Sequence, residues 1–171
     1  MDEMEAAKLV EATDWAEKLY VVGFAFNKKA DHVVLAHKDK PEWQKGFLNG
    51  VGGKVELDID VTYADAMARE FKEKTGMFTI GTEWAHFATM HSGGDKLGEE
   101  AMVFCFRIFT NDIFFKVSTQ ETEKIEIFEL HGADTWKGCK TLDRQKLTPH
   151  VSTILPMARD KGFNFGDFKM H

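Results

Sequence analysis

Residues 60–76 form the segment of this sequence that most restricts how the chain can fold. Apolar and charged residues recur there at helical spacing, and both ends carry helix-boundary signals. Thr62 is suited to cap the first turn, Asp65 is its capping-box partner three residues on, and Gly76 is a natural C-terminal stop. The sequence therefore predicts an amphipathic helix within this segment.

The predicted helix separates its side chains into two arcs. Glu70 and Glu73 lie one turn apart on one arc, where two carboxylates repel each other unless a cation lies between them. A solvated acidic face is the ordinary explanation of such a pair, so the preceding residues decide between the two interpretations. The other arc is apolar and is expected to face the core; it holds Ala64, Met67, Ala68 and Phe71.

Glycines crowd the segment just before the helix. Gly50, Gly52 and Gly53 allow a turn that residues with side chains resist, and such a turn brings backbone groups close to a ligand. A glycine turn followed by a helix with carboxylates is a natural platform for a divalent cation and a pyrophosphate. Because carboxylate and carbonyl oxygens are hard ligands, the pattern favours Mg²⁺ or Mn²⁺ over zinc.

The rest of the chain predicts an α/β fold. A second helix is expected to begin near Thr148, with Pro149 at its first position and Pro156 kinking or shortening it. Strands mixed with a few helices predict a mixed sheet with helices packed on its faces. The alternating or continuous apolar runs that predict strands cover residues 20–26, 32–37, 80–90, 101–109 and 124–130.

Length and composition limit the remaining possibilities. The 171 residues suit one domain, 1–171, with residues 1–18 as an N-terminal helix or arm. That acidic start lacks the apolar run of a signal peptide, and no stretch approaches the roughly 18 apolar residues of a membrane helix. Cys105 and Cys139 form no motif, and reduced thiols are the default in the cytosol. We therefore expect a cytoplasmic protein with no membrane partner, as a monomer or a homodimer.

The net charge restricts the ligand. With 22 basic and 28 acidic residues, the chain carries a formal charge of −6. This argues against duplex nucleic acid, which favours a basic face. A small nucleotide remains compatible, because a bound metal ion supplies local positive charge.

Residues 52–56 (GGKVE) and 68–77 (AREFKEKTGM) together resemble the Nudix box, G-x5-E-x7-R-E-U-x-E-E-x-G-U, in which U is an aliphatic residue. The resemblance implies a Nudix-type α/β/α sandwich with a mixed β-sheet. It also implies a metal-dependent hydrolase, with Mg²⁺ or Mn²⁺ as cofactor, that cleaves nucleoside diphosphates linked to another moiety.

Position by position, the resemblance implies roles for individual residues. The Gly52 carbonyl, Glu70 and Glu73 would approach metal ions, and Arg69 would position the acidic side chains through charge-assisted hydrogen bonds. Arg69, Glu70 and Glu73 are thus the expected catalytic residues. An acidic residue from a later loop usually completes the metal site; Glu121 or Glu123 matches best, and Glu99 and Glu100 match less well.

The sequence departs from the family pattern in two places. Gly53 and Arg69 are two residues further apart than the pattern requires, and either Asp58 or Asp60 is left to replace the intervening Glu. Lys74 stands where the second Glu of the E-E pair, a usual metal ligand, belongs, and a protonated lysine repels a metal ion. Three outcomes follow: Lys74 replaces one metal electrostatically, another carboxylate such as Glu121 or Glu123 takes over, or the domain binds without hydrolysing.

The turn also suggests a substrate. Residues 48–54 (LNGVGGK) resemble the equivalent segment of mammalian-type oxidised purine nucleoside triphosphatases, in which an Asn at the position of Asn49 reads the base edge. The alternative is that Asn49 only supports the turn. Gly53, Lys54 and Lys74 are the other expected substrate-binding residues, and Trp136 is either a stacking or a core residue.

The first substrate expectation is a (deoxy)nucleoside triphosphate, including oxidised purines, cleaved to monophosphate and pyrophosphate. ADP-ribose, dinucleoside polyphosphates and capped RNA remain open. The rival hypothesis is a catalytically reduced Nudix domain that serves as a nucleotide-binding sensor or interaction module, and Lys74 is the residue that favours it.

Overall fold

The computed structural model describes six parts of the chain: residues 18–92, 100–112, 116–130, 139–143, 145–163 and 166–170. The N-terminal helix or arm predicted for residues 1–18 lies outside them, apart from its last residue.

The described chain consists of nine strands, two α-helices and two short 3₁₀ helices. The strands are β1 (Lys18–Phe26), β2 (His32–His37), β3 (Leu48–Asn49), β4 (Val51–Lys54), β5 (Ala85–Ser92), β6 (Ala101–Phe109), β7 (Ile125–Glu129), β8 (Lys140–Thr141) and β9 (Gly166–Met170). The helices are η1 (Glu42–Gln44), α2 (Tyr63–Thr75), η2 (Gly81–Glu83) and α3 (Val151–Arg159).

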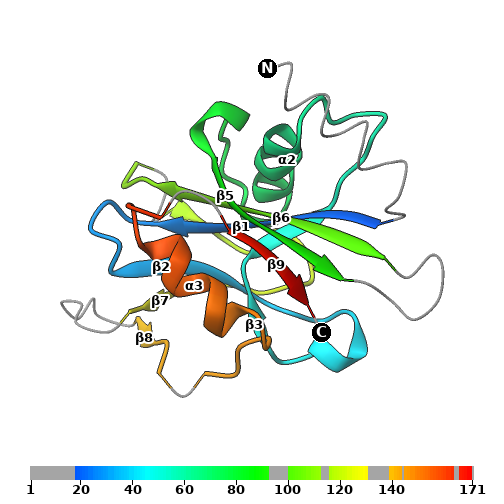
Figure 1. Cartoon of the computed structure of the whole chain (residues 1–171). Coiled ribbons are helices and arrows are strands. Elements are labelled where there is room, and N and C mark those ends of the chain that lie inside the picture. Colours follow the sequence, from blue (N-terminus) through cyan, green and yellow to red (C-terminus); the bar gives the residue numbers. More distant parts are fainter. Residues whose placement is uncertain are drawn as a thin grey trace.

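One mixed sheet contains all nine described strands, in the order β8-β7-β2-β1-β6-β5-β9, with β3 paired to β2 and β4 paired to β1 (Figure 1). β1 lies at its centre and runs parallel to β6 from Lys18 to Phe26. Its first half pairs antiparallel with β4, and its last two residues pair antiparallel with β2. This pairing holds the glycine-rich β4 at the centre of the sheet, beside the start of β1.

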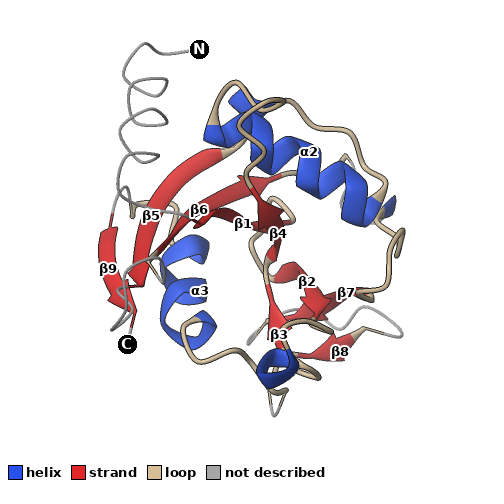
Figure 2. Cartoon of the chain, turned by 90° about the vertical axis from the view of Figure 1, so that its right-hand side faces the viewer, coloured by secondary structure: helices blue, strands red, loops and turns tan. Residues whose placement is uncertain are grey.

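The two helices cover opposite faces of the sheet, and each seals its own apolar cluster (Figure 2). On one face, Met67 and Phe71 of α2 pack with Val21, Phe104 and other inward-facing residues of the strands. On the other face, the buried side of α3 packs with a separate set of strand residues. The predicted α/β/α sandwich with a mixed sheet is confirmed.

The boundaries of α2 follow from the predicted signals. The Thr62 side chain accepts a hydrogen bond from Asp65 N, and the Asp65 side chain accepts one from Thr62 N, which completes the capping box. Gly76 ends the helix with φ 79°, a left-handed conformation that favours glycine.

Two predicted boundaries were wrong. Residues 80–84 are not strand: Ile80 and Trp84 flank η2, whose first turn is closed by the Glu83 side chain accepting from Ile80 N. The last helix begins at Val151 rather than near Thr148, because residues 146–148 pair with Leu48 instead. Pro156 lies inside α3, which ends three residues later. Among the described helices, none is long and apolar enough to span a membrane.

Candidate active site

Helix α2 presses Glu70 against the glycine turn. Glu70 is buried, although it carries a carboxylate. A Cβ added to Gly53 would lie 2.4 Å from the carboxyl carbon of Glu70, so the missing side chain at position 53 leaves the room that this carboxylate fills. Gly52 is also required, because a Cβ there would lie 1.9 Å from the Val21 carbonyl oxygen of β1. The contact between the glycine turn and α2 is thus made by the Glu70 carboxylate, which lies against Gly53.

Arg69 connects three segments: the glycine turn, the loop before α2 that contains Asp60, and α2 itself. Its Nε and Nη2 each donate to an Asp60 oxygen at 2.8 Å, a bidentate pair. Nη1 donates to Glu70 at 3.1 Å and to Glu73 at 3.3 Å, and Nη2 also donates to the Lys54 carbonyl at 3.0 Å. The hydrogen bonds to Asp60 raise the pKa of Arg69, so the guanidinium stays charged.

Of the two candidate aspartates, Asp60 is the one that binds Arg69. Asp60 is buried and accepts a further hydrogen bond from Glu56 N at 2.8 Å, whereas Asp58 is exposed. The two additional residues are absorbed in the loop before α2, which leaves Leu57, Ile59 and Val61 exposed. The sequence offered both aspartates; burial and the hydrogen bonds with Arg69 and Glu56 N distinguish Asp60 from the exposed Asp58.

We expect Asp60→Asn to lower the free energy of unfolding by about 2 kcal/mol, because it removes a charge-assisted bidentate partner from a half-buried guanidinium. Asp58→Asn is the matched control and should change it by less than about 0.5 kcal/mol. Urea denaturation of both variants measures the difference. Equal effects would show that Asp60 does not hold Arg69.

Glu70 and Glu73 are the two expected metal ligands on α2, and they differ in burial. Burial raises the pKa of Glu70 above its ordinary value, the Arg69 charge opposes the rise, and the Glu73 charge adds to it. Glu73 is more open, with 46% of its side chain exposed. A buried carboxylate beside a second carboxylate gains from a cation, so these donors fit a hard divalent ion.

The carboxylates of Glu121 and Glu123 approach a lysine. Lys74 Nζ lies 3.0 Å from a Glu121 oxygen and 3.0 Å from a Glu123 oxygen. Burial alone would lower the pKa of Lys74, but the hydrogen bonds to these carboxylates outweigh it and raise the pKa. No group of three or more His, Cys, Asp or Glu side chains within the described residues is placed to hold a metal ion. Metal binding by Glu121 or Glu123 therefore stays a prediction.

Three of the expected substrate-binding residues, Asn49, Gly53 and Lys54, belong to the glycine turn, whereas Lys74 lies in the last turn of α2. Asn49 is half-buried in β3, and its Oδ1 accepts from Gly50 N at 2.7 Å, as expected of a residue that supports the turn. Lys54 is exposed at the end of β4, with its carbonyl bound to Arg69. Glu99 and Trp136 lie outside the described residues.

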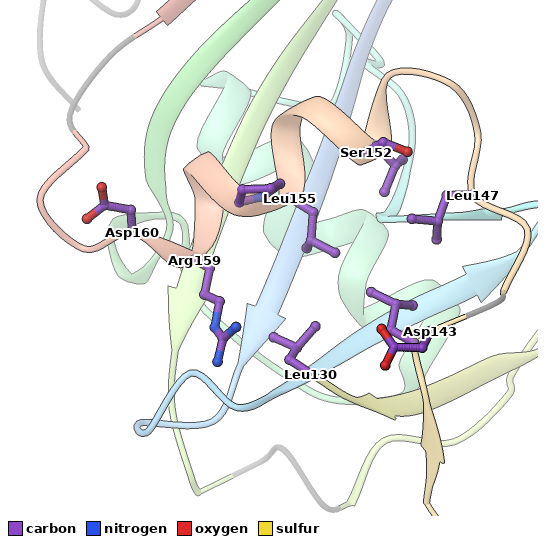
Figure 3. A pocket seen from close by; sticks show the side chains of 10 residues that line it. Leu130, Asp143, Leu147, Ser152, Leu155, Arg159 and Asp160 are labelled. Atoms are coloured by element: carbon purple, nitrogen blue, oxygen red, sulfur yellow. The ribbon is translucent and has the colours of Figure 1, made fainter. Parts of the chain in front are cut away.

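A pocket of about 630 Å³ lies elsewhere, beside α3, and none of the predicted site residues lines it (Figure 3). Apolar side chains form most of its wall, and Arg159 at one end donates to the Ala30 carbonyl. Its lining residues are Leu130, Leu142, Asp143, Leu147, Val151, Ser152, Leu155, Pro156, Arg159 and Asp160.

Comparison with known proteins gave one family match. The sequence model of the NUDIX domain matches residues 17–151, which is most of the chain. The comparison with curated proteins gave no match.

Solved structures share the fold at low identity. A MutT protein from Bacillus halodurans is 17% identical with a TM-score of 0.61, over 89% of this chain and 89% of that one. A MutT/nudix family protein from Enterococcus faecalis is 18% identical with a TM-score of 0.61, over 92% and 68%. The NUDIX domain of Shewanella oneidensis NrtR, solved with ADP ribose, is 16% identical with a TM-score of 0.52, over 74% and 82%.

Proposed function

Because the chain belongs to the Nudix family, we propose that it is a metal-dependent hydrolase that cleaves the diphosphate linkage of a nucleoside-diphosphate-linked substrate. One observation carries the proposal: the Glu70 carboxylate is buried against Gly53 and bound by Arg69, which Asp60 holds in turn. A carboxylate used only for solubility would lie in solvent, as Glu56 does.

The chain's own residues would divide the work as follows. Glu70, Glu73 and the Gly52 carbonyl would hold Mg²⁺ or Mn²⁺. When bound, the ion polarises the diphosphate and lowers the pKa of a water molecule for attack at phosphorus. Arg69 keeps Glu70 and Glu73 oriented, because its guanidinium donates hydrogen bonds to both carboxylates.

For the substrate, we propose a (deoxy)nucleoside triphosphate, with an oxidised purine as the first candidate base. Asn49 supports this choice, because its amide nitrogen has no hydrogen-bond partner among the described residues and is available to a base edge. The negative net charge supports a small nucleotide over a long nucleic acid.

A substrate screen with Mg²⁺ or Mn²⁺ tests the proposal. Purified protein should release a nucleoside monophosphate and pyrophosphate from a triphosphate, and a chelator should abolish the release. The panel includes normal and oxidised purine triphosphates, ADP-ribose, dinucleoside polyphosphates and capped RNA, with products separated by chromatography. Preference for one of the last three would replace the proposed substrate, and no turnover with either ion would overturn the hydrolase.

A second candidate function is nucleotide binding without hydrolysis, in a sensor or an interaction module. The observation that favours it is Lys74, whose ammonium faces the two later carboxylates that would otherwise strengthen metal binding. Calorimetry with a nucleotide, run beside the release assay, separates the two: binding without turnover supports the module, and metal-dependent turnover supports the enzyme.

A further inference from the structure

The segment formed by residues 117–125 is bound to the last turn of α2. Ser118 N donates to the Thr75 carbonyl at 3.1 Å, and Gln120 N donates to the Lys74 carbonyl at 3.3 Å. Val117 packs against the apolar cluster under α2. These contacts bring the acidic residues of the segment to the end of the helix that carries Lys74.

Two lysines bracket the buried carboxylate of this segment. Only 6% of the Glu123 side chain is exposed. Lys74 Nζ from α2 lies 3.0 Å from Glu123 Oε1 and 3.0 Å from Glu121 Oε2. Lys38 Nζ, from the chain after β2, lies 2.9 Å from Glu123 Oε2, close enough for an ion pair but without hydrogen-bond geometry. Each Glu123 oxygen therefore already faces a cation.

We propose that Lys74 takes the place of a divalent cation in joining α2 to the 117–125 segment. Glu121 and Glu123 then pair with lysines, and metal binding is left to Glu70 and Glu73, a part that rests on the proposed function. The charges explain the division: a divalent ion next to Glu123 would face Lys74 and Lys38, and like charges in a partly buried site repel strongly. Lys74 is a positioning residue here, because it acts through the segment that it fixes.

The first test measures Mn²⁺ binding by calorimetry on the full chain without nucleotide. Glu121→Gln is expected to keep the Mn²⁺ affinity within twofold of the unaltered protein, whereas Glu70→Gln should weaken it more than tenfold. A loss of more than tenfold in Glu121→Gln would overturn the proposal, because Glu121 would then be a metal ligand.

The second test exchanges the cation. With a chelator present, Lys74→Glu should lower the melting temperature, because the new carboxylate joins those of Glu121 and Glu123. Addition of Mn²⁺ should then raise the melting temperature of this variant by more than it raises that of the unaltered protein. Lys72→Glu, an exposed change on the same helical turn, is the matched control and should show no such gain. An equal Mn²⁺ response in Lys74→Glu and the unaltered protein would overturn the proposal.

Both tests give a result even if the protein hydrolyses no substrate, because they measure Mn²⁺ affinity and melting temperature. If Lys74→Glu does not fold, Glu121→Gln decides; if the unaltered protein binds no Mn²⁺, the metal response of Lys74→Glu decides. A protein that hydrolyses nothing but shows the expected Mn²⁺ responses would refute the proposed hydrolase and leave the role of Lys74 standing.

Discussion

Replacing Glu70 by Gln is expected to lower the turnover number of the Mn²⁺-supplied protein by about 10³-fold, equivalent to roughly 4 kcal/mol of transition-state stabilisation. Gln keeps the size of the side chain that fills the space at Gly53, but it removes the charge that would bind the ion. Because Glu70 is the buried carboxylate of the two proposed metal ligands on α2, and Glu73 is 46% exposed, no other change should cost as much activity.

The same substitution should not weaken the fold. Burial raises the pKa of Glu70, so the carboxyl group binds its proton more tightly in the folded protein than in the unfolded chain. At neutral pH, where the group is ionised in the unfolded chain, burying the ionised carboxylate therefore opposes folding. Gln removes that cost, and the melting temperature at pH 7 should stay equal or rise.

Product release and thermal melting, measured on one preparation, check both results for Glu70→Gln. Glu42→Gln, an exposed change in η1, is the matched control and should alter neither quantity. More than about a tenth of the original turnover surviving in Glu70→Gln would contradict the assigned role.

The features that could be predicted from the sequence are those with local causes. Thr62 and Gly76 set the ends of α2 through contacts within four residues, so a single sequence contains all the information they need. The continuous apolar runs of β2 and β6 likewise match buried strands on both edges of β1. The spacing of Glu70 and Glu73 on the helix follows from helical geometry alone.

The features that escaped prediction depend on contacts between distant segments. The glycine-rich residues 48–54 contain two strands, β3 and β4, because β2 and β1 provide their hydrogen-bond partners, while the local sequence predicts only a turn. The choice of Asp60 over Asp58 depends on the position of Arg69, nine residues on. The partners of Lys74 lie 47 and 49 residues away; the sequence marks Glu121 and Glu123 as candidate metal ligands but not as partners of this lysine.

Arg107 presents the same limit most clearly, because its role involves residues 50 positions away. The sequence predicts only that residue 107 lies in an apolar strand, whereas in the structure the buried guanidinium of Arg107 binds carbonyls at the C-terminal end of α3. Nη1 donates to the carbonyls of Met157 at 3.1 Å and Asp160 at 2.7 Å, and Nη2 donates to that of Phe163. These carbonyls belong to the last turn of α3 and the residues after it, where helical hydrogen bonding stops.

Arg107→Met is therefore expected to lower the free energy of unfolding by about 3–5 kcal/mol, the largest stability effect of any substitution proposed for this chain. The methionine still fills the apolar space beside Phe87 and Phe109, but it donates no hydrogen bond. The carbonyls at the end of α3 therefore lose their donor. The helix also loses a cation that stabilises its negative C-terminal end.

Thermal and urea unfolding measure the effect, which corresponds to a fall in melting temperature of roughly 10 °C for a chain of this size. Arg159→Met is the matched control: that arginine donates to one carbonyl, Ala30, at 2.6 Å, and its loss should cost about 1 kcal/mol. Arg107→Lys keeps the charge with fewer directed donors and should fall between the two. If Arg107→Met costs no more than Arg159→Met, the guanidinium does not hold α3 in place, and the packing of α3 over its apolar cluster must be sufficient by itself.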